Sequence, residues 1–147
     1  MTEALSITRT VQIQASQQKV WQALTEADLI AQWFGNHATI DLRPGGAMWL
    51  RWDEYDAEGR AEVVEVSPIS RFSFRWERTP QTGPLREDNL TLVVFELSEQ
   101  DGGTSLTVTE SEWEKLALSE TEIRSAMEDN RGGWVGELND LIAFLEK

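Results

Sequence analysis

The first 35 positions show two different periods of apolar and polar residues. Residues 5–14 alternate between the two kinds, which is typical of a half-buried strand. Apolar residues then recur at helical spacing after Ser16, a residue type that caps helix N-termini, and this helix is expected to end near Thr25. Residues 25–28 resemble a capping box and predict a second short helix, which Gly35 would end. The chain is therefore expected to begin with a strand and two short helices.

Period-two alternation returns between residues 38 and 111 and is interrupted by turn residues. Asp101-Gly102-Gly103 separates two alternating runs and is a strong hairpin signal. A hairpin joins neighbouring strands, so the sheet is antiparallel at least there. With the first strand, the sheet is expected to have about six or seven strands. The runs between the turns cover residues 38–42, 48–53, 60–66, 71–77, 90–97 and 104–111.

The last 29 residues carry the clearest helical pattern. Residues 119–122 (SETE) form a capping box, and a helix from there to residue 146 would be about 40 Å long at 1.5 Å per residue. Gly132-Gly133 in its middle lowers helix propensity, so the pair indicates either close packing against the sheet or a point where the helix bends. One face is apolar and consists of Ile123, Met127, Trp134, Leu138, Leu141, Ile142 and Leu145.

This order of elements has an obvious packing arrangement, in which the antiparallel sheet curls and the long helix lies in its concavity. We therefore predict an α+β fold, with residues 1–147 forming a single domain around an apolar interior. Because strand side chains alternate between faces, parity identifies the concave face. The residues expected to point inward are Met48, Leu50, Trp52, Val64, Val66, Phe72, Phe74, Trp76, Val93, Phe95, Leu106 and Val108.

The charge of the chain bears on its partners. There are 26 acidic and 13 basic residues, giving a net charge of −13. Nucleic-acid binding needs a basic surface that displaces counterions from phosphates, and anionic membranes attract basic segments for the same reason. Neither nucleic acid nor a membrane is therefore an expected partner.

The residue types also limit the chemistry. The chain has no cysteine and one histidine, so disulfides, thiolate catalysis and cysteine-based zinc sites are excluded. No ligand spacing for a metal is visible, and Gly45-Gly46 lacks the lysine of a phosphate-binding loop, so neither metal nor cofactor is expected. No signal peptide and no apolar stretch of about 20 residues is visible, and a cytoplasmic location is expected.

Several stretches occur in the order typical of one known family: 20–25 (VWQALT), 29–34 (LIAQWF), 41–46 (DLRPGG), 64–68 (VEVSP), 71–76 (RFSFRW), 95–97 (FEL), 103–111 (GTSLTVTES), 133–134 and 138–141. In them the chain resembles the family of activator-of-heat-shock-protein-90-ATPase homologues, within the START-like (SRPBCC) superfamily. The resemblance covers nearly the whole chain. It implies the helix-grip fold, with a cavity between the long helix and the sheet.

The resemblance is more specific for fold than for function, because the superfamily hosts binding, transport, cyclase and co-chaperone roles. The co-chaperones of this family carry a separate N-terminal domain that engages the chaperone. We expect no such domain in 147 residues, so a chaperone is not the expected partner.

A pocket lined by many apolar rings suits an apolar or aromatic ligand, although the same side chains could simply fill the core. The alternative remains open, because parity does not distinguish a packed core from a lined cavity. The candidate ligand-binding residues are Trp33, Met48, Leu50, Trp52, Val64, Phe72, Phe74, Trp76, Phe95, Val108, Glu110, Trp113, Met127, Asn130 and Trp134.

Two of the polar residues could carry acid–base chemistry. Glu110 is in phase with Leu106 and Val108, so parity places a carboxylate on the apolar face, where burial disfavours its charged form. Alternatively the strand ends near Thr109, and Glu110 is solvated or paired with an arginine. His37 is expected in a loop near the cavity rim, either as a helper in catalysis or as an exposed histidine with no role.

Two further residues could border the cavity. Trp113 belongs to the connection 111–118, which could gate the cavity or be a surface loop with one ring buried. Asn130 interrupts the apolar helix face and could contact a ligand or face solvent at its edge. The leading hypothesis is a non-catalytic binder of a small hydrophobic or amphipathic molecule. The alternatives are a cyclase- or hydrolase-type enzyme using Glu110 and a chaperone-cofactor-like interaction module.

Overall fold

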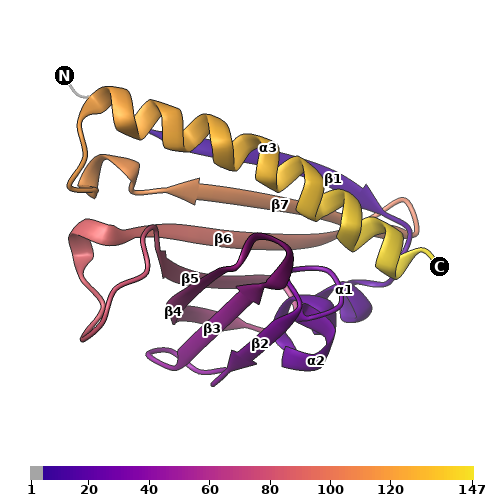
Figure 1. Ribbon diagram of the computed structural model, residues 1–147. Coiled ribbons are helices and arrows are strands. Elements are labelled where there is room, and N and C mark those ends of the chain that lie inside the picture. Colours follow the sequence, from indigo (N-terminus) through magenta and orange to yellow (C-terminus); the bar gives the residue numbers. More distant parts are fainter. Residues whose placement is uncertain (1–4) are drawn as a thin grey trace.

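The structure is a computed structural model that describes residues 5–147. Within this range the elements follow the predicted order of a strand, two short helices, a run of strands and a long helix (Figure 1). In chain order they are β1 (Ser6–Ile13), α1 (Gln17–Thr25), α2 (Ala27–Ile30), β2 (His37–Ile40), β3 (Ala47–Trp52), η1 (Asp53–Tyr55), β4 (Ala57–Ser67), β5 (Arg71–Glu77), η2 (Glu87–Asn89), β6 (Leu90–Gln100), β7 (Gly103–Ser111), η3 (Trp113–Lys115) and α3 (Glu120–Leu145).

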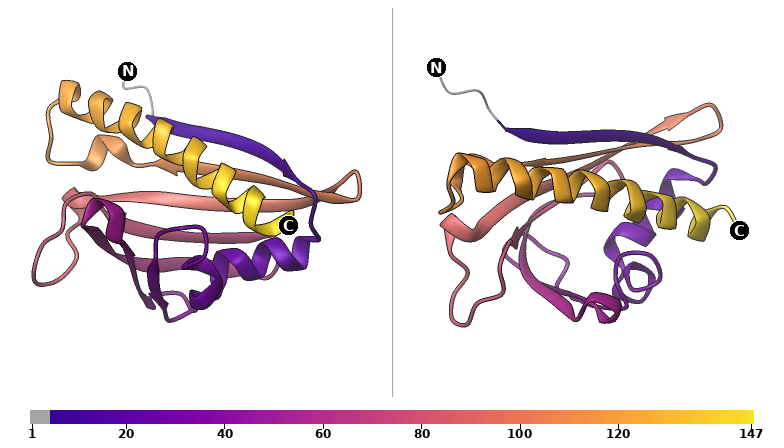
Figure 2. Two further views of the ribbon diagram at one scale, coloured as in Figure 1. Left: turned by 45° about the vertical axis from the view of Figure 1, so that its right-hand side comes forward. Right: turned by 45° about the horizontal axis from the view of Figure 1, so that its top comes forward.

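The strands form one seven-stranded antiparallel sheet in the order β1-β7-β6-β5-β4-β3-β2. Figure 2 shows that the sheet curls, which brings β2 and β3 round below α3. The predicted hairpin joins β6 and β7. Asp101 and Gly102 occupy its turn with φ of 52° and 78°, as a type I′ turn requires, and Gln100 pairs with Gly103.

The helix α3 begins with the predicted capping box. The Ser119 N–H donates to Oε1 of Glu122 over 3.0 Å, and the Glu122 N–H donates to Oγ of Ser119 over 3.1 Å. The helix runs along the concave side of the sheet, over β1 and β7, and α1 and α2 lie near its C-terminal end (Figure 1). No helix among residues 5–147 combines the length and the apolar composition needed to cross a membrane.

Gly132 and Gly133 do not serve close packing, which corrects one of the two interpretations of this pair. A Cβ built on either glycine would meet nothing within 4 Å, and α3 is continuous through both positions. The space beside Gly133 is therefore open rather than filled by the sheet.

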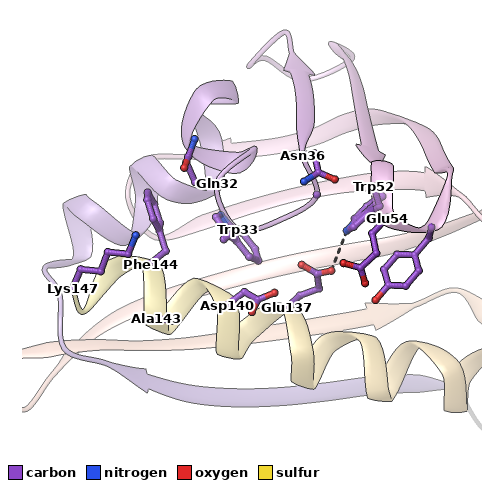
Figure 3. A pocket seen from close by; sticks show the side chains of 12 residues that line it. Gln32, Trp33, Asn36, Trp52, Glu54, Glu137, Asp140, Ala143, Phe144 and Lys147 are labelled. Atoms are coloured by element: carbon purple, nitrogen blue, oxygen red, sulfur yellow. Dashed lines mark hydrogen bonds between the residues drawn. The ribbon is translucent and has the colours of Figure 1, made fainter.

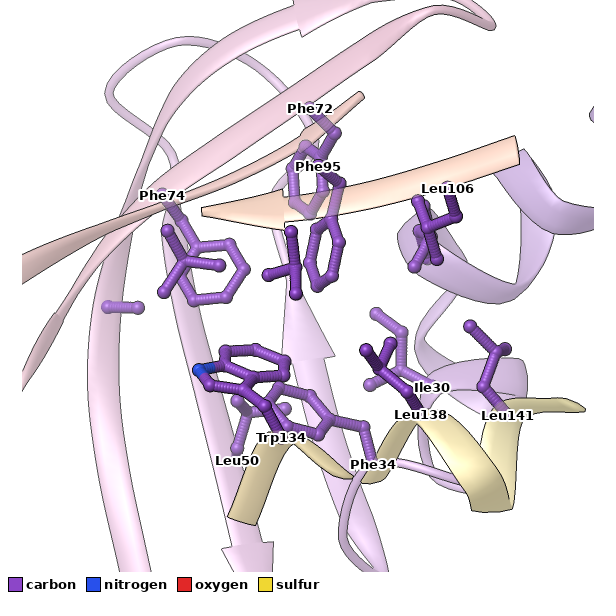
Figure 4. Packing of buried hydrophobic residues seen from close by; sticks show 14 of the residues in the cluster. Ile30, Phe34, Leu50, Phe72, Phe74, Phe95, Leu106, Trp134, Leu138 and Leu141 are labelled. Carbon is purple, nitrogen blue, oxygen red and sulfur yellow. The ribbon is translucent and has the colours of Figure 1, made fainter. Parts of the chain in front are cut away.

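Most of the interior between α3 and the sheet is a packed core. Figure 4 shows rings from β5 and β6 facing leucines and Trp134 from α3. Most of the residues predicted to point inward lie in this core, while Trp52, Val66 and Trp76 are half-buried and pack against it. The fully buried ones are Met48, Leu50, Phe72, Phe74, Val93, Phe95, Leu106 and Val108. Side chains therefore fill most of the interior, as close packing favours.

Val64 is the exception, and its inward assignment is wrong. Val63 pairs with Phe74 and Glu65 with Ser73, so two neighbours on β5 face three residues of β4 and Val64 is the extra residue of a β-bulge. The buried residue is Val63, which is 1% exposed. The bulge changes the parity of the strand at this point, which the alternation of apolar residues alone does not reveal.

Candidate ligand-binding site

A hollow of about 730 Å³ opens between α3 and the curled part of the sheet, where β3, β4 and β5 contribute to its lining. This volume lies within the range of roughly 300–1,000 Å³ typical of small-molecule sites. We call it the tryptophan groove, because three of its walls are indole rings. Its lining residues are Phe34, Trp52, Tyr55, Ala57, Trp76, Arg78, Asp129, Asn130, Gly133, Trp134 and Glu137.

A second hollow of about 450 Å³ adjoins the tryptophan groove and is shown in Figure 3. It shares Trp52, Tyr55 and Glu137 with the groove and continues toward the C-terminal end of α3. We call it the polar hollow, because polar and charged side chains make up most of its lining. Its lining residues are Gln32, Trp33, Gly35, Asn36, Trp52, Glu54, Tyr55, Glu137, Asp140, Ala143, Phe144 and Lys147.

The aromatic wall of the tryptophan groove is built around Phe34, which directly follows the turn after α2. Its ring stacks on Trp76 and on Trp134 with centroid separations of 5.6 Å, and it meets Trp52 edge-on at 5.2 Å. Gly35 makes this turn possible, because it has φ of +87° and a Cβ there would lie 2.6 Å from the carbonyl oxygen of Arg51. The rings thus support one another without a ligand.

Two of these rings are also held by Glu110, which is 1% exposed. Its Oε1 accepts hydrogen bonds from Nε1 of Trp134 and from Nδ2 of Asn130, each over 2.9 Å. Its Oε2 accepts bonds from Nε1 of Trp76 over 2.9 Å and from Oγ1 of Thr91 over 2.6 Å. A carboxylate offers about four lone-pair sites, so all of them are occupied. Glu110 fixes the groove wall from behind and does not itself line either hollow.

Glu137 is the carboxylate that does line both hollows. It lies on α3 at the boundary of the two hollows, and its Oε1 accepts a hydrogen bond from Nε1 of Trp52 over 3.0 Å (Figure 3). Burial raises the pKa of Glu137 to about 7, and the neighbouring carboxylates of Asp140 and Glu54 add to this rise while the Trp52 bond opposes it. The carboxyl group is therefore poised between its neutral and charged forms near neutral pH.

Five of the sequence-predicted ligand residues line at least one of the hollows, and the others do not. Trp52, Trp76, Asn130 and Trp134 line the tryptophan groove, and Trp33 lines the polar hollow. Asn130 meets the groove and also contacts Glu110, rather than facing solvent at the helix edge. Val64 lies outside the core, and the remaining candidates are buried in it: Met48, Leu50, Phe72, Phe74, Phe95, Val108, Glu110, Trp113 and Met127.

Sequence reasoning missed several lining residues, above all Phe34, Tyr55 and Glu137. For Glu137 a signal exists, because it follows Trp134 by three positions and precedes Leu141 by four, which places a carboxylate in the apolar stripe of α3. Tyr55 has no such signal. It belongs to a 3₁₀ turn between two strands, which the alternation of apolar and polar residues does not reveal.

His37 lines neither hollow, although its chain neighbour Asn36 lines the polar hollow. His37 is the first residue of β2 rather than part of a loop, and its Nε2 lies 2.9 Å from Oδ2 of Asp53 on the sheet edge. The hydrogen bond from His37 is the main cause that lowers the pKa of Asp53. No group of three histidine or carboxylate side chains in the described part of the chain is arranged to hold a metal ion.

The connection 111–118 before α3 is held in place by a buried ring and by hydrogen bonds. Trp113 is 0% exposed, and its Nε1 donates to the carbonyl oxygen of Glu110 over 3.1 Å. Ala117 is tied to the segment before β6, because its N–H donates to the carbonyl oxygen of Asp88 over 2.9 Å. Of the two interpretations of this connection, the geometry favours a loop with one buried ring.

A curled antiparallel sheet that packs around a long C-terminal helix, with an opening between sheet and helix, defines the helix-grip class of proteins. Within this class, the family model described as "Activator of Hsp90 ATPase homolog 1-like protein" matches residues 14–146. The chain belongs to this family. No curated protein gave a significant match.

Solved structures agree with this assignment of the fold. Protein MLL2253 from Mesorhizobium loti is 22% identical with a TM-score of 0.79, over 97% of each chain. The Aha1 dimer from Colwellia psychrerythraea is 22% identical with a TM-score of 0.77, over 97% of this chain and 96% of that one. DynU16, a protein in the dynemicin biosynthetic locus, is 26% identical with a TM-score of 0.75, over 97% of this chain and 47% of that one.

Proposed function

We propose that the protein binds a small hydrophobic or amphipathic molecule in the tryptophan groove, without catalysing a reaction on it. The observation that carries this proposal is the groove itself, a preformed space of about 730 Å³ walled by Phe34, Trp52, Trp76 and Trp134. Rings of this kind bury large areas of an apolar ligand, and the polar groups at the rim can fix its orientation. The groove lies between α3 and the sheet, where the family resemblance implies a cavity.

The arrangement of polar residues favours binding over catalysis. Glu110, the leading acid–base candidate, has its four lone-pair sites filled by protein donors and lies behind the groove wall. A general acid or base has to come within hydrogen-bond reach of the reacting group. His37, its proposed helper, is paired with Asp53 on the sheet edge.

The apolar surface of residues 5–147 gives no comparable support to a protein partner. The exposed large apolar side chains among residues 5–147 are Leu42, Tyr55, Leu118 and Val135, which come from four separate segments. Apolar side chains that are exposed singly are normal on a protein surface. The exposed apolar side chains therefore do not support the hypothesis of a chaperone-cofactor-like interaction module.

The test uses a matched pair of variants on α3. Gly133→Leu places a side chain in the tryptophan groove, and Gly132→Leu adds the same side chain at a position that does not line it. Neither Cβ meets another atom within 4 Å, and both changes improve helix propensity by about 1 kcal/mol, so both variants should fold.

A panel of hydrophobic fluorophores and lipids is titrated into each protein by calorimetry and tryptophan fluorescence. We expect saturable binding of at least one apolar class to the natural protein and to Gly132→Leu, and a loss of about tenfold or more for Gly133→Leu. The proposal fails if no apolar class binds, or if Gly133→Leu binds as well as Gly132→Leu does.

A further inference from the structure

The rim of the tryptophan groove is strongly acidic where it meets the polar hollow. Glu137 from α3 and Glu54 from η1 point toward one another across this space, and Asp140 follows one turn later on the helix (Figure 3). Asp129 adds a fourth carboxylate on the groove side. The acidic groups thus come from two elements that face each other across the same opening.

These central carboxylates form no ion pair within the described part of the chain. The ion pairs found among residues 5–147 involve none of Glu54, Glu137 and Asp140. Lys147 lines the polar hollow and Arg78 the groove, but neither forms an ion pair with these carboxylates, and the charged groups that raise the pKa of Glu137 are Asp140 and Glu54. The site therefore contains negative charge that its own cations do not neutralise.

The aromatic walls favour the same sign of ligand charge. The faces of indole rings are electron-rich and attract a cation within about 6 Å of the ring centre. Trp52 takes part in both features, since its ring walls the groove while its N–H donates to Glu137. An anion in this groove would meet repulsive carboxylates and the negative faces of the rings, whereas a cation would be attracted by both.

We propose that the ligand of the tryptophan groove is an amphipathic amine, with its ring system against the wall formed by Trp52, Trp76 and Trp134 and its ammonium group beside Glu137. This inference rests on the proposed function and adds the charge and the chemical class of the ligand. The groove defines the site, and the carboxylates at its rim select among the molecules that fit it.

A consequence for protons follows from the position of Glu137. Its pKa of about 7 rests on burial beside Asp140 and Glu54, and a nearby ammonium group lowers it. The groups that face it are Trp52, Glu54 and Tyr55 from β3 and η1 and Asp140 from its own helix, with Arg78, Asp129 and Lys147 further along the two hollows. An amine therefore releases protons from the protein on binding near neutral pH, and it binds more weakly as the pH falls below about 7.

The test compares three probes of one shape: 2-naphthylmethylamine, 2-naphthalenemethanol and 2-naphthoate, which are cationic, neutral and anionic near pH 8. Calorimetric titration of the natural protein should give an affinity for the amine about tenfold above that for the alcohol, and weaker binding still of the carboxylate. In buffers of different ionisation enthalpy near pH 7, the amine alone should show proton release.

Glu137→Gln isolates the cause, because the amide oxygen can still accept the bond from Trp52. This variant should bind the amine and the alcohol within about threefold of each other and show no proton release. Glu99→Gln is the matched control, since it removes one charge from an exposed position on β6 outside both hollows, and it should keep the preference.

The outcomes separate the two proposals. If none of the three probes binds and the wider panel of apolar ligands is also silent, the proposed function itself fails. If the alcohol or the carboxylate binds as tightly as the amine, the groove binds apolar molecules and the inference of an amine is wrong. The inference also fails if Glu137→Gln keeps the full preference for the amine.

Discussion

Among the individual residues, Glu110 has the largest structural role that the sequence does not explain. Its donors are uncharged, namely two indole N–H groups, an amide and a hydroxyl. Hydrogen bonds to a charged group are stronger than those between neutral groups, and four of them replace the water that burial removes. Glu110 therefore joins β5, β6 and α3 to its own strand β7.

Replacing Glu110 by glutamine tests this role. A glutamine side chain offers one acceptor oxygen and turns an NH₂ group toward the two donors at the other position, which are either Trp134 and Asn130 or Trp76 and Thr91. We expect Glu110→Gln to lower the free energy of unfolding by about 2–4 kcal/mol in urea denaturation, with a changed tryptophan emission spectrum. Unchanged stability would show that Glu110 does not hold the rings.

Glu137 has the opposite effect on stability, because its neighbourhood disfavours its charge. Its folded pKa of about 7 lies above the ordinary value of 4.5, so between these values the folded state holds a proton that the unfolded state lacks. The contribution of this group to stability is full below the lower value and declines as the pH rises to about 7. Above that pH the charged carboxylate lowers the stability of the fold.

The Glu137→Gln variant should therefore gain stability relative to the natural protein as the pH rises. We expect equal stability near pH 4.5 and an advantage of about 1 kcal/mol near pH 8, a value reduced by the partial exposure of the group to water. Urea denaturation at both pH values measures the difference. A constant difference across this range would contradict the assignment. A residue that lowers stability while facing a ligand space is typical of functional sites.

Among the elements, β4 shows where pattern reasoning fails. Alternation predicts strand faces as long as the register continues, and the bulge at Val64 interrupts it. Parity is correct for β3, β5, β6 and β7, whose predicted inward residues are buried or pack on the core. The bulge has no marker in its sequence such as a glycine, because three of the four residues 63–66 are valines that suit either face.

The bulge predicts unequal costs for two identical substitutions. Val63→Ala removes buried methyl groups from the core and should lower the free energy of unfolding by about 2 kcal/mol. Val64→Ala changes a half-buried side chain outside the core and should cost less than about 1 kcal/mol. Urea denaturation of both variants measures the two values. Equal costs would show that the register assigned to β4 is wrong.

For the whole molecule, the fold was predictable and the open space was not. Two clear periods, a capping box and a hairpin turn fix the order of elements, and the family resemblance points to the same architecture. The position of the ligand space depends on which rings fill the interior. Phe72, Phe74 and Phe95 occupy the inner half, whereas Trp52, Trp76 and Trp134 border the gap that remains. The volumes and orientations of the side chains decide which rings fill the interior, and the alternation of residues along a strand predicts neither.

The acidic character of the chain has its local counterpart at the groove. The net charge of −13, which makes nucleic acid an unexpected partner, also bears on the charge of a ligand. A field of this sign concentrates cations near the surface and becomes weaker as salt is added. The global charge and the carboxylates of Glu54, Glu137 and Asp140 thus act in the same direction on an approaching amine.

The four hydrogen bonds of Glu110 also limit how far the groove can adapt. Moving the indole of Trp76 or Trp134 to admit a larger guest would strip an acceptor from a buried N–H, and Thr91 and Asn130 oppose the move from the other side of the carboxylate. The wall that these touching rings form consequently keeps its position, so the groove adapts little to the shape of a guest molecule.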